Sequence, residues 1–231
     1  MSAIILDTET HDMNGYPIEI AHVPVNFRNG ELAVDKDACF DEYFSCPQPI
    51  SYGAMAVHHI LESDIAGKPS YETFRLPEGI QYIIGHNVDY DIQAIKLADK
   101  SVNVKAICTL ALSRMVWPDD AHNLSALIYK FTNGSVKARE SIRNAHNAKQ
   151  DVLLTAVLLK QICKVLGVKD MQSLFLFSEQ ARIPTHMTFG KHKGTPIKDI
   201  PADYVDWLLK QSDLDPYLKK GWCFKKYADI K

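Results

Sequence analysis

The sequence lacks long hydrophobic runs. About 20 consecutive apolar residues are needed to cross a bilayer, and no stretch of the chain approaches that length, so no membrane span is expected. The short apolar run at the N-terminus has no basic residues ahead of it and no cleavage pattern after it. This absence of a signal peptide predicts a cytoplasmic protein. No internal repeat or low-complexity tract is present either.

Cysteine is also scarce, and its spacing excludes two kinds of site. The chain has 5 cysteines, an odd number, and none of them forms a C-x-x-C pair. We therefore expect neither a disulfide framework nor a zinc site, and we interpret the cysteines as reduced thiols that serve as small core residues. They are Cys39, Cys46, Cys108, Cys163 and Cys223.

Basic residues are rare in the first part of the chain. Residues 1–90 carry 4 Lys and Arg against 14 Asp and Glu, whereas residues 91–231 carry 22 against 14. This division is typical of an acidic cluster that faces a basic surface, as metal binding together with a polyanionic substrate requires. An ordinary surface with uneven charges would explain it equally well.

The apolar content predicts one full domain with a small appendage. Of the 231 residues, 46% are hydrophobic and 23% are charged, which suits a sizeable core. β-Branched residues and turn signals predict five strands, at 3–10, 16–27, 29–44, 78–87 and 104–109. Helical spacing predicts helices within 53–67 and at 88–98, 110–117, 124–131 and 148–166. The fold class is therefore α/β, with a mixed five-stranded sheet flanked by helices.

The character of the sequence changes near residue 180. The stretch "SEQARIPTHM" has no clear period, and the sequence after it is aromatic, basic in patches and rich in turns. A helix is expected to open near Pro201. We place a domain boundary at about residue 182, which gives a domain over 1–182 and a small C-terminal module over 183–231.

Acidic residues end the first predicted strand. In "AIILDTET", Asp7 and Glu9 are two residues apart, so their side chains point to the same side of the sheet. Two carboxylates this close repel each other unless a cation lies between them. The pair alone is weak evidence, because Glu9 could be exposed at a fraying strand end while Asp7 caps a turn.

Two more groups of acids occupy similar places. Asn87 lies where a helix N-cap belongs, and Asp89 and Asp91 follow it at the start of the predicted helix. His146 precedes Asp151, which opens the long helix at 148–166. Any one of these acids could simply be a favourable charge near a helix N-terminus.

Three groups of acids, one of them with a histidine, nevertheless make an oxygen-rich site for hard cations. Mg²⁺ or Mn²⁺ fits such ligands best. Two such ions about 4 Å apart can activate a water and stabilise the leaving oxygen of a phosphodiester. A neutral histidine beside that water could remove its proton.

The three groups also form a recognisable pattern. "DTET", "HNVDYD" and "HNAKQD" match D-x-E-T, H-N-x-x-[FY]-D and H-x-A-x-x-D, and they resemble the three motifs of the DEDDh, or DnaQ-like, exonuclease superfamily over residues 3–165. The resemblance implies a ribonuclease-H-like fold and 3′→5′ hydrolysis that releases nucleoside 5′-monophosphates. It also assigns roles to residues: two metal ions held by Asp7, Glu9, Asp91 and Asp151, a general base at His146, and a backbone contact to the terminal nucleotide at Thr8.

Further similarities and one departure concern the substrate. The turn "FGKHKG" resembles the C-terminal module of the exodeoxyribonuclease X group, the closest match in pattern. Where relatives often continue "T-G-L" after the first motif, this chain has "HDMNG". The resemblance implies that Met13 and Asn14 contact the terminal base, and that His58 contacts the DNA backbone unless it is only a helix-end histidine. Asn87 is a further substrate-binding candidate.

The function indicated is a metal-dependent 3′→5′ exonuclease whose partner is DNA, as a single strand or the 3′ end of a duplex. A small RNA exonuclease similar to oligoribonuclease or ribonuclease T is the alternative within the same class. A binding module that keeps the fold without chemistry is the alternative outside it, and the complete set of four acids and one histidine argues against that. The sequence indicates no oligomeric state.

Overall fold

The computed structural model describes residues 2–143, 147–212 and 214–228, with only the backbone described from 223 onward. It divides into two compact units, Met1–Ser178 and Glu179–Lys231. Within the described residues, no helix combines the length and the apolar character that a membrane span requires. Cys39, Cys46, Cys108 and Cys163 are free thiols, as their spacing predicts.

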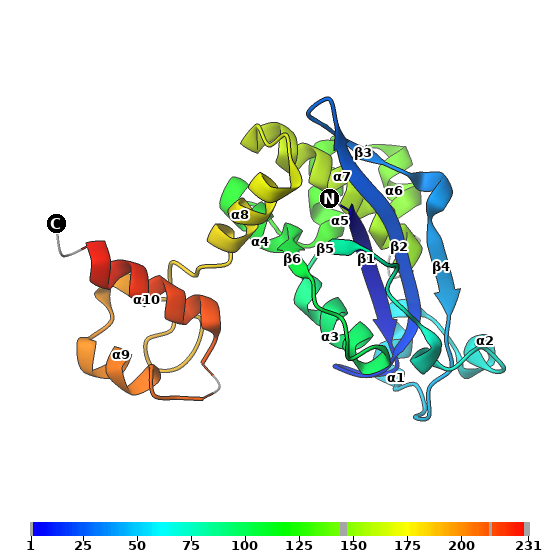
Figure 1. Ribbon diagram of the computed structural model, residues 1–231, viewed down its shortest axis with the longest axis horizontal. Coiled ribbons are helices and arrows are strands. Elements are labelled where there is room, and N and C mark those ends of the chain that lie inside the picture. Colours follow the sequence, from blue (N-terminus) through cyan, green and yellow to red (C-terminus); the bar gives the residue numbers. More distant parts are fainter. Residues whose placement is uncertain (1, 144–146, 213, 229–231) are drawn as a thin grey trace. The chain divides into compact units, whose positions relative to one another are not determined.

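The first unit is built on a mixed six-stranded sheet (Figure 1). Four strands follow the order β2-β1-β5-β6, and the short β3 and β4 both pair with β2. β1 runs antiparallel to β2 and parallel to β5, so it lies between the two kinds of pairing. The strands are β1 Ser2–Thr10, β2 Pro17–Arg28, β3 Glu31–Val34, β4 Phe40–Tyr43, β5 Ile80–Gly85 and β6 Lys105–Cys108.

The sixth strand arises because the predicted strand at 29–44 is divided in two. A 3₁₀ turn at Lys36–Ala38 separates β3 from β4, and its residues are exposed. The polar stretch of Asp35, Lys36 and Asp37 has nothing apolar to bury there, so it leaves the sheet. The predicted class, a mixed sheet flanked by helices, is confirmed.

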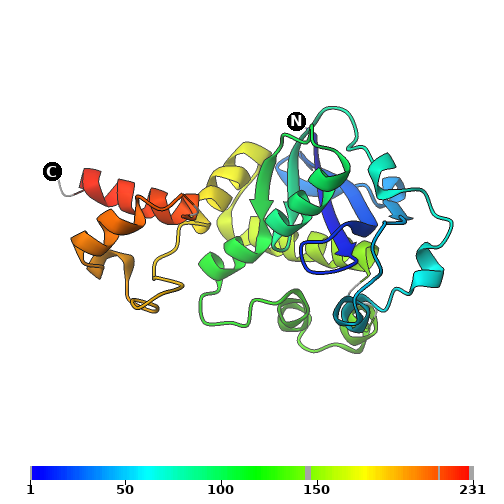
Figure 2. The ribbon, with the colours of Figure 1, turned by 90° about the horizontal axis from the view of Figure 1, so that it is seen from below.

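Helices cover the sheet on both faces (Figure 2). Ala3, Ile4, Ile5 and Leu6 of β1 are consecutive and all buried, which requires cover on each side of the strand. α3 and α7 both pack on β1. The unit's helices are α1 Tyr52–His58, α2 Glu62–Ile65, α3 Val88–Ala98, α4 Thr109–Val116, α5 Leu124–Phe131, α6 Val136–Ile142 and α7 Ala148–Leu166. α8 Met171–Ala181 begins in this unit and ends in the second, since the division falls after Ser178.

The ends of α7 follow from its sequence. Asn147 accepts a hydrogen bond from the Gln150 N–H through its side chain, which caps the first turn. Gly167 ends the helix in the left-handed conformation, with φ +64°. Between them a buried stripe, including Val152, packs against the sheet. The helix therefore delivers its first turn, with Asp151, to a fixed place.

The second unit is small and has a core of its own. It holds a 3₁₀ turn at Ile197–Asp199 and the helices α9 Ala202–Leu208 and α10 Pro216–Ala228. Pro201 immediately precedes α9, where the sequence predicts a helix to open. The core residues are Met187, Ile197, Ile200, Leu208, Leu218 and Trp222. We keep the boundary after Arg182 as a proposal for the domain organisation.

Candidate functional site

Three carboxylates converge at the end of β1. Asp7 and Glu9 alternate with Thr8 along the strand, so both project from the same face, and Asp151 reaches them from the first turn of α7. One oxygen from each of the three lies within 4.8 Å of the others. A strand end and a helix start, both anchored by buried apolar residues, hold the three groups in place. Oxygen donors at this spacing suit a hard divalent cation.

Asp91 joins this cluster through Thr8. It lies in the first turn of α3 with 4% of its surface exposed. The backbone N–H and the side-chain hydroxyl of Thr8 both donate to Asp91 Oδ1, each at 2.9 Å. Because Thr8 stands between Asp7 and Glu9, these two bonds fix Asp91 beside the strand end. The fourth predicted acid therefore adjoins the other three.

Burial and mutual repulsion raise the pKa values of the carboxylates in this cluster. Burial, followed by repulsion from Asp91 and Asp151, raises the pKa of Asp7 well above its ordinary value. Burial, followed by repulsion from Asp151, raises the pKa of Glu9 to about 8. Burial also raises the pKa of Asp91 to about 7, although the bonds from Thr8 oppose the shift. A divalent cation bound among these oxygens would remove the repulsion.

Glu19 is a buried carboxylate that the sequence does not single out. It lies opposite Glu9 in the pairing of β1 with β2, and 1% of its surface is exposed. Its two oxygens accept from the Asn147 side chain at 2.6 Å and the Ala148 N–H at 3.1 Å. Burial raises its pKa to about 7, against the effect of the Ala148 bond. Glu19 therefore ties the start of α7 to the sheet.

The signal for Glu19 was present but ambiguous. In "YPIEIAHV" a single glutamate interrupts an apolar strand, a pattern that usually marks the solvent-facing side of a sheet. Here Ile18 and Ile20 beside it are fully buried as well, so the strand is covered on both faces. A charge in such a strand needs partners, and the start of α7 supplies them.

Hydrogen bonds hold the backbone of the segment that follows β1, whereas the Met13 side chain is exposed. Asp12 accepts from the Met13 N–H at 2.8 Å and from the Ser51 hydroxyl at 3.1 Å. Those two bonds lower its pKa. The Ser51 N–H also donates to the His11 carbonyl at 2.8 Å, so the segment is attached to the start of α1. Met13 is 83% exposed, and Asn14 has φ +57°, in the left-handed region.

The other predicted contacts occupy varied places. His58 is buried at the end of α1, and its Nδ1 accepts from the Ile60 N–H at 2.9 Å, so one ring nitrogen serves the helix end. Asn87 immediately precedes α3 with φ +81°, and its side chain makes no capping bond. The Thr8 N–H donates to Asp91, and the backbone contact of Thr8 with the terminal nucleotide stays a prediction. Asp89 is exposed on α3, unlike the buried Asp91.

His146 lies outside the described residues, so its predicted role as general base is carried forward as a proposal. His86, which opens the second motif, has a structural place. Its Nδ1 is 3.0 Å from the Thr109 hydroxyl and its Nε2 is 2.8 Å from the His122 carbonyl. Burial lowers its pKa to about 4, so the ring is neutral near pH 7. His86 thus joins the end of β5 to the start of α4.

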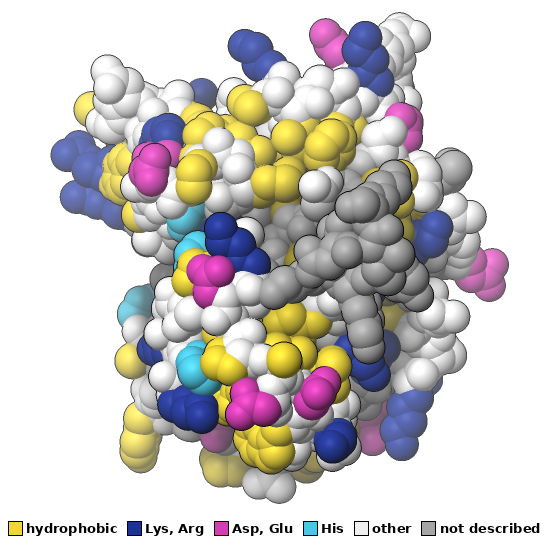
Figure 3. Space-filling model, turned by 90° about the vertical axis from the view of Figure 1, so that its left-hand side faces the viewer, with side chains coloured by type: hydrophobic (Ala, Val, Ile, Leu, Met, Phe, Trp, Pro, Cys, Tyr) yellow, Lys and Arg dark blue, Asp and Glu magenta, His cyan; other side chains and the backbone are white. Residues whose placement is uncertain are grey.

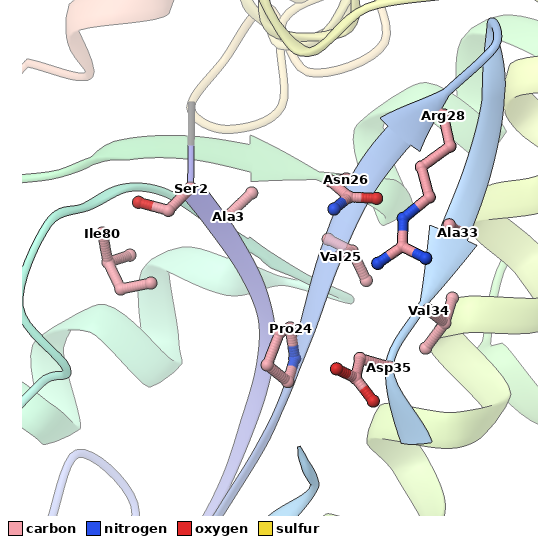
Figure 4. Close-up of a pocket in the computed structure, with 10 residues that line it drawn as sticks. All are labelled: Ser2, Ala3, Pro24, Val25, Asn26, Arg28, Ala33, Val34, Asp35 and Ile80. Carbon is pink, nitrogen blue, oxygen red and sulfur yellow. The ribbon is translucent and has the colours of Figure 1, made fainter. Parts of the chain in front are cut away.

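A hollow on the sheet lies away from these residues. It has a volume of about 470 Å³ and is lined by the first residues of β1, by the last part of β2 from Pro24 to Arg28, and by the end of β3 (Figure 4). Ser2 stands at its edge, whereas Asp7 and Glu9 are at the opposite end of the same strand. The chemistry-bearing residues are therefore not in the hollow.

Three comparisons with known proteins bear on this site. Exodeoxyribonuclease 10 of Escherichia coli (strain K12) is 29% identical over 221 residues, which cover 93% of this chain and 94% of the relative. A structure of exonuclease X, solved in complex with 5′ overhanging duplex DNA, is 27% identical with a TM-score of 0.58, over 75% of this chain and 99% of that one. The cell-death related nuclease 4 (CRN-4) matches at 16% identity with a TM-score of 0.53, over 73% of this chain and 65% of that one, which shows the fold alone.

The C-terminal unit matches separately. A family described as "Putative quorum-sensing-regulated virulence factor" covers residues 180–222. The two exonuclease matches agree with the three motifs and with the sheet on which the acids lie. The motifs and these similarities together support a DnaQ-like exonuclease that is similar to exonuclease X.

Proposed function

We propose that the protein is a metal-dependent exonuclease that hydrolyses DNA from the 3′ end and releases nucleoside 5′-monophosphates. The observation that carries the proposal is the convergence of Asp7, Glu9 and Asp151 within 4.8 Å, with Asp91 fixed beside them by Thr8. Burial, and after it repulsion from neighbouring carboxylates, raises the pKa of Glu9, and a bound cation would relieve that repulsion. Their arrangement makes sense as a metal site.

The donor set suits two Mg²⁺ or Mn²⁺ ions. Asp7, Glu9, Asp91 and Asp151 would hold them, and all four offer only oxygen, the ligand that these cations prefer. When bound, the ions lower the pKa of a water and stabilise charge on the phosphodiester. Asp7 and Glu9 supply rigid ligands from the sheet, and Asp151 supplies one from α7.

Proton removal falls to His146 in this proposal. It precedes Asp151 by five residues, and a neutral imidazole can accept the proton of an attacking water near pH 7. Glu19 contributes by holding Asn147 and Ala148, the residues at which α7 begins. These hydrogen bonds fix the first turn of α7, on which Asp151 lies.

The choice of DNA rests on the relatives. One is named an exodeoxyribonuclease and another was solved with duplex DNA, and both are similar over most of their length. Met13 supports a contact with the terminal base because it is apolar, 83% exposed and only four residues after Glu9. Four residues span at most about 14 Å, so the side chain cannot lie far from the site.

Matched DNA and RNA oligonucleotides of one sequence, each labelled at the 5′ end, test the proposal. With Mg²⁺ or Mn²⁺ we expect a ladder that shortens from the 3′ end of the DNA, release of nucleoside 5′-monophosphates, and full inhibition by EDTA. Faster digestion of the RNA would assign the enzyme to RNA instead. If the folded protein digests neither oligonucleotide, the chain would instead be a nucleic-acid-binding module without catalytic activity.

A further inference from the structure

The C-terminal unit presents an aromatic and basic patch, formed by Phe189, Lys191, His192, Tyr204 and Trp207. The Lys191 ammonium is 5.0 Å from the centre of the Tyr204 ring. The centre of the His192 ring is 4.6 Å from the centre of the Tyr204 ring, and the centre of the Trp207 ring is 5.4 Å from it. One lysine and three rings are thus in continuous contact, from the "FGKHKG" turn to α9.

Two side chains of the patch are exposed although they are large and aromatic. Trp207 is 53% exposed and Phe189 is 42% exposed. Trp222, in contrast, is 6% exposed and fills the core of the same unit. The unit therefore folds around Trp222 and leaves Trp207 more than half exposed beside Tyr204, where its free surface can meet a ligand.

The patch is preformed by a glycine turn. Gly190 has φ +67°, a conformation that residues with a Cβ rarely adopt, and a Cβ there would lie 2.8 Å from the Tyr204 hydroxyl. The Lys193 N–H donates to the Gly190 carbonyl at 3.1 Å and closes the turn. Because Tyr204 packs directly on the turn, the rings are ordered before any ligand arrives, which lowers the entropy cost of binding.

Charge narrows the choice of ligand. Residues 179–231 carry 10 Lys and Arg against 7 Asp and Glu, so the unit is modestly basic. Figure 3 shows one face on which hydrophobic, histidine and basic side chains lie next to one another, with acidic side chains among them. Asp203 and Asp206 are exposed on α9 beside Tyr204 and Trp207. A ligand must then gain from stacking as well as from charge.

We propose that this patch is a stacking platform for single-stranded DNA. The inference rests on the proposed exonuclease function, and it gives the C-terminal unit a role in holding the substrate. A single strand offers unpaired bases, which stack on exposed rings, and phosphates, which Lys191 attracts. Base stacking is tolerant of sequence, as an exonuclease that digests any sequence requires.

Tryptophan fluorescence tests the platform directly. The chain has 3 tryptophans, and Trp222 is buried while Trp117 packs against Phe131 with ring centres 4.7 Å apart. A thymidine oligonucleotide of about 20 residues, titrated into the full chain in EDTA, should quench the emission of Trp207 by stacking on it. EDTA prevents cleavage, so the measurement does not depend on catalysis.

Five variants separate stacking from folding. Trp207→Leu should remove most of the quenching and weaken binding by about tenfold, and Trp207→Phe should restore the affinity because it keeps a ring. Lys191→Gln should lower the slope of affinity against salt by about one phosphate contact, more than Lys219→Gln, an exposed lysine of α10 outside the patch. Asp206→Asn should tighten binding by about twofold, since it removes an anion beside the rings.

The outcomes are exclusive. The proposal is wrong if the oligonucleotide does not quench the fluorescence. It is also wrong if the Trp207→Leu protein is folded by circular dichroism and binds DNA like the parent. The patch would then be a candidate surface for a protein partner. Metal-dependent digestion of DNA by that same protein would then show that the proposed function stands without it. Quenching without any digestion would support the platform and remove the proposed function.

Discussion

In the N-terminal unit the proposed catalytic carboxylates are crowded together, whereas the C-terminal unit gives its half-buried carboxylate partners of opposite charge. Glu179 accepts from the Lys220 ammonium at 2.7 Å and from the Tyr217 hydroxyl at 2.6 Å. Burial raises its pKa, but these bonds outweigh that effect, so the net shift is downward. For Asp7 and Glu9 burial raises the pKa too, and the charges that add to the shift are all other carboxylates.

The difference separates two uses of charge. The Glu179 group holds a small unit together and needs no further ligand. The β1 cluster opposes folding when it is ionised, so it is explained only by a ligand that the folded chain binds. Removing a carboxylate of the cluster should therefore lower activity and raise the stability of the metal-free protein. Removing the pair of Glu179 with Lys220 should do neither.

The largest expected effect comes from Asp151→Asn, which removes one charge from the cluster and keeps the shape. We expect activity on a DNA oligonucleotide to fall about a thousandfold, equivalent to roughly 4 kcal/mol of transition-state stabilisation. The melting temperature without metal should rise by a few degrees, because less repulsion remains. Steady-state kinetics and thermal melting in EDTA measure the two.

Asp89→Asn is the matched control, since Asp89 is exposed in the same turn of α3 as the buried Asp91. Its activity should stay within about threefold of the parent, as surface changes usually do little. A greater loss from Asp89→Asn than from Asp91→Asn would show that the wrong acid of "VDYD" has been assigned.

The second prediction concerns pH in the absence of metal. The pKa of Glu9 is about 8, and those of Asp91 and Glu19 are about 7, all raised by burial above their unfolded values. The folded state then binds more protons than the unfolded state between about pH 4.5 and 8, so stability must fall as pH rises through that window. We expect the melting temperature in EDTA to drop by several degrees from pH 5 to pH 8.

Added Mn²⁺ should reverse the fall. It competes with protons for the same oxygens, so it should raise the melting temperature more at pH 8 than at pH 5. A melting temperature in EDTA that does not change between pH 5 and pH 8 would show that the carboxylates of the β1 cluster do not destabilise the metal-free protein. Equal stabilisation by Mn²⁺ at both pH values would show the same.

Thr8→Val tests the support of the site with a smaller change. Valine keeps the volume but loses the hydroxyl that donates to Asp91 Oδ1 at 2.9 Å, while the backbone bond remains. A hydrogen bond to a charged group contributes about 1.5 kcal/mol, so we expect about a tenfold loss of activity and an upward shift of the acidic limb of the pH–rate profile. Thr8→Ser retains the hydroxyl and should behave like the parent; equal losses in both would assign Thr8 a packing role.

The sequence predicts the regular parts of the fold well. The helices at 88–98 and 148–166 are observed with the predicted limits, because apolar spacing sets both and Asn147 caps the second. Asn87 occupies the corresponding position before the first helix without a capping bond. α6 and α8 lack such clear spacing and are not indicated by the sequence. α6 does have a local signal, since Ser135 caps it by accepting from the Ala138 N–H at 3.1 Å.

The site was predictable where spacing sets geometry and not where long-range pairing does. Asp7 and Glu9 share a face because strand side chains alternate, and no partner is needed to see it. Glu19 is different, since its role depends on Asn147, 128 residues away along the chain. The pairing of Thr8 with Asp91 is likewise a contact between distant segments that neither segment specifies alone.

The smallest expected effect lies at Met13, where an exposed side chain of the N-terminal unit resembles the exposed rings of the other unit. Met13 is 83% exposed, and the bonds that Asp12 makes to the Met13 N–H and to Ser51 hold its backbone in place. An exposed apolar side chain on this held backbone, four residues after Glu9, can press against the last base pair of a duplex. Opening one pair costs about as much as one stacking contact supplies, about 1–3 kcal/mol, so the contact can decide whether blunt ends are digested. Met13→Ala should therefore slow digestion of a blunt duplex about fivefold and leave a single strand of the same sequence within about twofold. The ratio of the two rates, in mutant and parent, is the measurement, and Met13→Leu should preserve it. An unchanged ratio in Met13→Ala would mean that the residue does not contact the terminal pair, and that the bond between Asp12 and Ser51 directs the segment away from DNA.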